Sequence, residues 1–172
     1  MEATEITPQM VSCGGPLPEL EIPMINTMVN CLTIEHRRLD ELNMRLAYAA
    51  TGLAGDPGAA TTYQCAIEAW DEIQRRLWSH LQIEDQLVLT WGRAHQAISD
   101  EMIDSLVAEH KKIRELVGAL PAWSTDLESE RSPEDRAKLA HNLLALAQTL
   151  DSHVERHEAE ILPAILRALF RQ

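Results

Sequence analysis

The sequence predicts an all-α protein: an antiparallel up-down-up-down four-helix bundle with a flexible N-terminal tail and a short C-terminal helical extension. Aromatic residues make up only 4% of the chain while Leu and Ala abound, a composition that favours helices over sheets. Apolar residues recur in steps of three and four through four long segments. The chain also repeats itself, since IEHRRLDEL (34–42) returns as AEHKKIREL (108–116), and SHLQIEDQLVL (79–89) returns as SHVERHEAEIL (152–162).

Composition and charge exclude several classes of function. The net charge of -12 argues against a nucleic-acid partner or an anionic membrane, whose binding proteins are basic. No run approaches the roughly 18 apolar residues that cross a bilayer, and the acidic start lacks the pattern of a secretory signal. Cys13, Cys31 and Cys65 are odd in number and share no metal-binding spacing, which favours a reduced, cytoplasmic location.

The first half of the chain divides into a tail and two helices. Residues 1–21 are rich in Pro and Gly and form the expected tail, and residues 22–172 form the bundle domain. The first helix is predicted from about Pro23 to Ala50. TGLAGDPGAA (51–60) is a breaker loop, and the second helix follows from about Thr62 to Trp91.

The second half repeats this plan with clearer end signals. Ser99, followed by two acidic residues, is a capping residue for the third helix, which Pro121 stops. After an acidic loop, Ser132 and Pro133 give the cap and first turn of the fourth helix. Pro163 is expected to kink or end that helix, and the final ILRALFRQ should form a short helical piece over the end of the bundle.

Histidines occupy the apolar stripes of all four predicted helices. A single buried histidine is more often a hydrogen-bonded core residue than a metal ligand. Several imidazoles aimed at one place cannot satisfy one another's acceptors without a cation or a chain of donors, so the group favours a metal site. The histidines on the stripes are His36, His80, His110, His153 and His157; His95 and His141 lie off them.

Carboxylates on the same stripes narrow the choice of metal. Glu84 follows His80 by one helical turn, and Glu158 follows His153 by five residues and flanks His157. An isolated His-x-x-x-Glu pair is more often a surface ion pair, but here both residues replace leucines on an apolar stripe. Imidazoles with carboxylates favour iron or manganese pairs, or zinc, over calcium or magnesium.

These patterns together resemble the hemerythrin-like (HHE cation-binding) family over about residues 25–168. The resemblance rests on E-H in the first and third helices, on H-x-x-x-E and H-x-x-x-x-E near the ends of the second and fourth, and on E-I-L-P at 160–163. It implies a bundle that holds two non-haem iron ions joined by an oxo or hydroxo bridge. Carried over by position, it implies that His36 and His80 bind one iron, that His110 and His153 bind the other, and that Glu84 and Glu158 bridge them.

The chain departs from the oxygen-carrying pattern of that family in the third helix. Arg114 stands where a second histidine is expected. We infer that His157, one turn beyond the first histidine of the fourth helix, supplies the absent imidazole; alternatively, the repeat places it where the second helix has its carboxylate. Glu158 is turned about 140° from that first histidine on an ideal helix, so Glu160 could compete for its role. Asp40 is a further candidate ligand, although a solvent-facing role suits it better.

The resemblance implies a diiron protein that binds or responds to O2, NO or peroxide, as a carrier or as a redox sensor read out by a separate redox or signalling partner protein. Two alternatives stay open: a diiron enzyme acting on peroxide or O2, and a metal-storage or structural bundle that holds zinc or a single metal. A ferritin-like diiron enzyme is set aside, because its Glu-x-x-His pairs are absent from these stripes.

Overall fold

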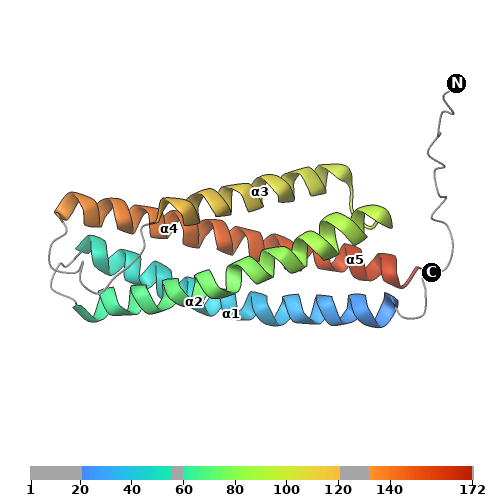
Figure 1. Ribbon diagram of the computed structural model, residues 1–172, viewed down its shortest axis with the longest axis horizontal. Helices are drawn as coiled ribbons and strands as arrows, with labels where there is room; N and C mark the ends of the chain where they lie inside the picture. The colour runs from blue at the N-terminus through green and yellow to red at the C-terminus, as the bar shows by residue number, and fades with distance from the viewer. Residues whose placement is uncertain (1–20, 56–59, 121–131, 172) are drawn as a thin grey trace, which may run out of the picture.

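Four long helices alternate in direction along one axis in the computed structural model (Figure 1), which describes residues 21–55, 60–120 and 132–171. Within these ranges every regular element is helical, so the predicted antiparallel bundle is confirmed. Residues 1–20 of the predicted tail lie outside the described part. The long helices are α1 (Glu21–Gly55), α2 (Ala60–Glu84), α3 (Asp100–Ala119) and α4 (Pro133–Arg156).

Helices α2 and α4 each continue into a π-helical segment. These are η1 (Asp85–Gly92) after α2 and η3 (His157–Ile161) after α4, and α5 (Leu162–Leu169) completes the chain. Helix α1 packs along both α2 and α4, α3 packs along α4, and α5 contacts α1 at the end of the bundle. None of the helices that the structure describes is both long and apolar enough to cross a membrane.

The predicted helix starts are confirmed, and one predicted helix end is wrong. The Ser99 side chain accepts a hydrogen bond from the amide of Met102, and Ser132 caps α4 in the same way. Helix α1 was expected to end at Ala50 but runs through the first half of the predicted loop to Gly55. The side chain of Leu53 is buried in the core there, and this packing outweighs the low helix propensity of the neighbouring glycines.

Pro163 lies in the first turn of α5, directly after the π-helical segment η3. A proline ring clashes with the carbonyl four residues earlier and offers no N–H to the helix. The wider π turn before it accommodates that break, so the chain continues without a loop. The predicted C-terminal helical piece is therefore present as α5, with Ile165 and Leu169 buried against the bundle.

The buried interior consists of two apolar clusters with a polar layer between them. One cluster fills the end near residues 53 and 120, and the other fills the end near α5. Members of the first include Leu46, Trp70, Leu77, Ile113 and Leu143. Members of the second include Ile25, Leu32, Leu87, Trp91, Leu106 and Ile165. This arrangement keeps water away from the polar layer on both sides along the bundle axis.

Candidate metal centre

The polar layer consists of five imidazoles and one carboxylate, each at most 1% exposed. Helices α1 and α3 supply one histidine each. Helix α2 supplies a histidine and a glutamate one turn apart, so both face the bundle axis. Helix α4 supplies a histidine near its end, and the first residue of η3 supplies another. The six residues, called the cage below, are His36, His80, Glu84, His110, His153 and His157.

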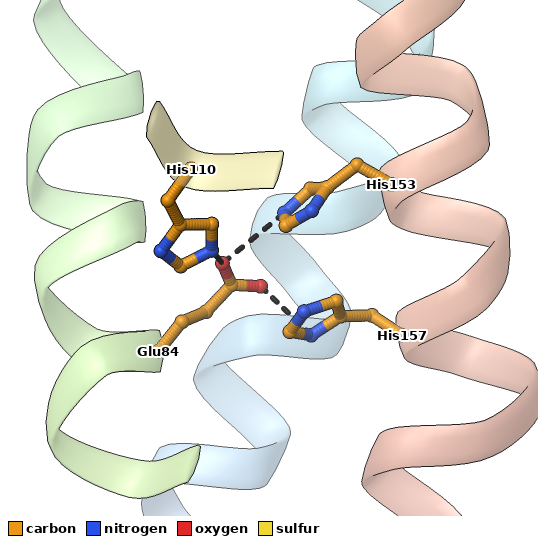
Figure 2. A group of neighbouring side chains, drawn as sticks. All are labelled: Glu84, His110, His153 and His157. Atoms are coloured by element: carbon orange, nitrogen blue, oxygen red, sulfur yellow. Dashed lines mark hydrogen bonds and ion pairs between the residues drawn. The ribbon is translucent and has the colours of Figure 1, made fainter. Parts of the chain in front are cut away.

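The carboxylate of Glu84 lies at the centre of the cage, and its two oxygens face different imidazoles (Figure 2). Oε1 lies 3.3 Å from Nε2 of His36 and 3.1 Å from Nε2 of His80. Oε2 lies 3.1 Å from Nε2 of His110 and 3.1 Å from Nε2 of His153. We call the first pair of histidines the Oε1 half of the cage and the second pair the Oε2 half.

His157 lies between the two halves. Its Nδ1 is 2.9 Å from Oε1 of Glu84, and its ring centroid is 4.5 Å from that of His153 and 5.6 Å from that of His36. Figure 2 shows its ring on the opposite side of the carboxylate from His110. The fifth imidazole therefore completes the cage from η3, the continuation of α4, rather than from α3.

Three of the imidazoles have a carboxylate on their outer nitrogen. Nδ1 of His36 donates to Oε1 of Glu158 at 2.7 Å, and Nδ1 of His110 donates to Oδ1 of Asp85 at 2.8 Å. Nδ1 of His153 donates to Glu109 at 3.4 Å. A proton fixed on Nδ1 leaves the lone pair of the neutral ring on Nε2, which points into the cage. This is the arrangement by which proteins orient histidine ligands of metals.

The cage contains more buried nitrogen atoms than it can satisfy by itself. Nδ1 of His80 and Nε2 of His157 are buried without a hydrogen-bond partner among the described residues, and the other ring nitrogen of each contacts only the Glu84 carboxylate that the cage shares. An unpaired buried polar atom is costly, and a bound cation removes that cost. Nitrogens of His110, His153 and His157 lie with an oxygen of Glu84 within 4.8 Å of one another. His36, His80 and Glu84 form a second such set.

These donor sets fit a pair of transition-metal ions. Imidazole nitrogens with a carboxylate oxygen suit iron, manganese and zinc, whereas calcium and magnesium require oxygen ligands. A single carboxylate with one oxygen toward each set can bind two ions at once. The residues present therefore fit two metal ions that share Glu84.

The charges of the metal-free cage are set by burial and by close contacts. Burial opposes the charge on Glu84, but His157, His110 and His153 outweigh it and hold the pKa of this carboxyl well below its usual range. Burial likewise opposes the charge on His153, but hydrogen bonds to Glu109 and Glu84 raise its pKa to about 9. Burial lowers the pKa of His157 to about 4 against the pull of Glu84, so this ring is neutral at neutral pH.

A cleft of about 360 Å³ between α3 and α4 borders the cage at His153. The imidazole of His153 forms part of its wall, and Glu109 lies beside it. Lys112 and Ser152 also line this cleft. Its volume lies at the lower end of the range of ligand pockets.

The structure brings six of the seven residues proposed as ligands from sequence into the cage and leaves one outside. Glu158 was expected to bridge the metals, but its side chain is 43% exposed and contacts the outer nitrogen of His36. Glu160, its competitor, is 59% exposed beside Arg156. Asp40 likewise takes no part in either set of candidate ligands.

Sequence reasoning missed the outer carboxylates Asp85 and Glu109. A signal for each was present in the repeat: Asp85 precedes Glu158 by the same 73 positions that separate His80 from His153. Glu109 directly precedes His110. The resemblance led us to expect a histidine at the position of Arg114. The guanidinium of Arg114 forms an ion pair with Asp85, with 3.1 Å between Nη2 and Oδ2.

Both π-helical segments begin at the cage. Segment η1 starts directly after Glu84. Segment η3 starts at His157, which is the counterpart of Glu84 in the sequence repeat. A π turn adds a residue to the helical repeat and is frequent at functional sites. It lets Leu87 and Ile161 return to the apolar core beyond.

Comparison with known proteins gives one family and no individual relative. The family model described as the hemerythrin HHE cation binding domain matches residues 27–165, which is most of the chain. Neither the curated proteins nor the solved structures provide a match. The matched range contains all six residues of the cage.

Proposed function

The chain belongs to the hemerythrin HHE cation-binding domain family, and from that premise we propose that it is a non-haem diiron protein that binds or responds to O2, NO or peroxide. The observation that carries the proposal is the central carboxylate. Each oxygen of Glu84 faces its own set of imidazoles, as a bridge between two ions requires. Two ferrous ions, when bound, would supply the electrons that O2 takes up.

The surroundings of the cage support the binding of a small ligand. The two apolar clusters enclose it along the bundle axis, which excludes water from both sides. The cleft beside His153, of about 360 Å³, has room for a small molecule next to the cage. We therefore favour a carrier or a redox sensor, which a separate partner protein would read out, over an enzyme with a large substrate.

The small negative charge of the cage ligands favours a low oxidation state of the bound iron. Five imidazoles and one carboxylate contribute a single negative charge to the cage, because Glu158 lies outside it. Neutral ligands stabilise divalent ions relative to trivalent ones. We expect the iron pair to be reduced more readily than in a site with two bridging carboxylates.

The same observation favours a second candidate, a bundle that stores or is stabilised by zinc or a single divalent metal. Zinc accepts imidazole-rich sites and has no redox chemistry of its own. Cys31 and Cys65 are free thiols in the described residues, which is compatible with a reducing, cytoplasmic location for either function.

Anaerobic reconstitution distinguishes these functions. The metal-free chain is loaded with Fe²⁺, and visible spectra are recorded before and after addition of O2 and, separately, of NO. An absorption band that develops with O2 and is bleached by reduction over repeated cycles supports the proposal. The Glu84→Gln variant serves as the matched control and should give no band. If the chain binds zinc but retains no iron, or if bound iron does not respond to O2, NO or peroxide, the diiron proposal is wrong.

A further inference from the structure

The outer nitrogens of the cage are held differently in its two halves. In the Oε2 half, both imidazoles have a carboxylate partner: Asp85 for His110 at 2.8 Å and Glu109 for His153 at 3.4 Å. Both acids are partly buried, with side chains 35% and 28% exposed. The two histidines that define this half are therefore both fixed in orientation from behind.

Each of these two carboxylates is held in turn by an arginine. Oδ2 of Asp85 accepts a hydrogen bond of 3.1 Å from the guanidinium of Arg114. Glu109 pairs with Arg156, whose guanidinium also donates to Oγ of Ser105 at 2.7 Å. The Oε2 half thus has two chains that run from arginine to carboxylate to imidazole. A carboxylate with a second anchor loses fewer alternative conformations when the imidazole in front of it binds a metal.

The Oε1 half lacks this support. His36 is held by Glu158 alone, and among the described residues no arginine pairs with that carboxylate. Nδ1 of His80 is buried and has no hydrogen-bond partner. The repeat offers Glu35 as the counterpart of Glu109, but its two oxygens pair with Arg38 and Arg76 instead.

From this difference we infer that the two metal positions are unequal: the Oε2 half binds the first ion with higher affinity, and Asp85 and Glu109 are its positioning residues. The inference rests on the proposed metal centre but not on iron or on O2. A histidine ligand whose outer nitrogen is held by a carboxylate is oriented before the metal arrives and is a stronger donor. Both effects favour the half in which both imidazoles are held.

Calorimetric titration of the metal-free full-length chain with Zn²⁺, in competition with a chelator, tests the order of filling. We expect two resolved steps. Asp85→Ala should weaken the tighter step by about 10- to 100-fold, the range found for loss of an outer partner of a metal ligand, and leave the weaker step unchanged. Glu158→Ala should weaken only the second step. Asp85→Asn retains an oxygen that accepts the bond from His110 and should recover most of the affinity.

Two further measurements separate positioning from a general loss of structure. Glu115→Ala is the matched control on α3, because this exposed side chain pairs only with Lys111 and should leave both steps unchanged. With Co²⁺ in place of Zn²⁺, the absorption spectrum of the first ion should change in Asp85→Ala and not in Glu158→Ala. Circular dichroism of each metal-free variant verifies that the helices are intact.

The possible outcomes are distinct for the two proposals. Two coincident steps, or a first step weakened by Glu158→Ala and not by Asp85→Ala, would overturn the inference while leaving the diiron proposal standing. A single ion per chain would contradict a pair of metals and with it the claim of two unequal positions, even if sensitivity to Asp85→Ala showed that Asp85 positions a ligand of that one ion. A chain that binds no metal would overturn both.

Discussion

Nδ1 of His157 lies 2.9 Å from Oε1 of Glu84, and these two residues occupy the same place in the two copies of the sequence repeat. Glu84 follows His80 by four residues, and His157 follows His153 by four. Two carboxylates at these positions would face each other in a buried site and repel, whereas a neutral imidazole beside a carboxylate does not. The difference between the copies is therefore what lets both side chains point to the centre of one cage.

Replacing the central carboxylate should remove the metals without unfolding the bundle. Glu84→Gln keeps the size of the side chain but removes the only negative charge inside the cage. We expect a loss of metal affinity greater than the roughly 10- to 100-fold caused by removing an outer partner. Elemental analysis of the reconstituted protein measures it. Glu68→Gln, an exposed residue of the same helix paired with Arg45, should retain full metal content; equal metal content in both variants would contradict the central role of Glu84.

His157 should matter for metal binding and Glu160 should not. The imidazole is fully buried at the centre, while the carboxylate of Glu160 is 59% exposed beside Arg156. His157→Ala should reduce metal retention during dialysis against a chelator, because a nitrogen donor is lost from the cage. Glu160→Gln should behave like the unmodified protein. The reverse result would show that the acid, and not the histidine, completes the site.

The apolar cluster near the loops should carry much of the stability of the fold. Leu143 is fully buried in that cluster, and its neighbour Leu144 is 40% exposed. Leu143→Ala leaves a cavity and should lower the free energy of unfolding by about 2 to 5 kcal/mol. Leu144→Ala should change it by roughly 0.5 kcal/mol or less, as is usual at the surface. Urea denaturation of the metal-free variants gives both values, and similar values for the two would contradict the packing.

The metal-free protein should be most stable between about pH 6 and 7. The pKa of His153 is raised to about 9, so its contribution to stability is complete below the unfolded pKa of about 6.5 and is lost as pH rises through 9. The pKa of His157 is lowered to about 4, so the fold favours its neutral form and loses stability as pH falls from about 6.5 through 4.

Denaturation of the metal-free chain at several pH values measures this dependence. His153→Gln should flatten the alkaline side of the stability curve while leaving the acidic side in place. A stability that rises steadily from pH 6 to pH 9 would show that His153 is not held as a cation by Glu109 and Glu84.

The sequence was sufficient to predict the bundle and most of the cage because both depend on helical periodicity. Residues spaced by three or four positions share a face of a helix, so His80 and Glu84 had to point the same way. Ser99 and Ser132 marked helix starts through local hydrogen bonds that need no tertiary information. The extension of α1 to Gly55 was not predictable in this way, because it depends on where Leu53 packs.

The outer contacts of the cage were beyond what periodicity can predict. Glu158 lies five residues after His153, a step that turns it away from the bundle axis, and the structure places it behind His36 on another helix. The partners of Asp85 and Glu109 likewise lie on neighbouring helices. Such contacts depend on the rotation of one helix against the next, which a pattern along a single helix does not determine.

Anomalous diffraction from crystals of the iron-loaded protein tests the central claim most directly. The account predicts two iron peaks on either side of the Glu84 carboxylate, one beside Nε2 of His36 and His80 and the other beside Nε2 of His110 and His153. A single peak, or iron bound at Glu158 and not at Glu84, would contradict a carboxylate-bridged pair inside this cage.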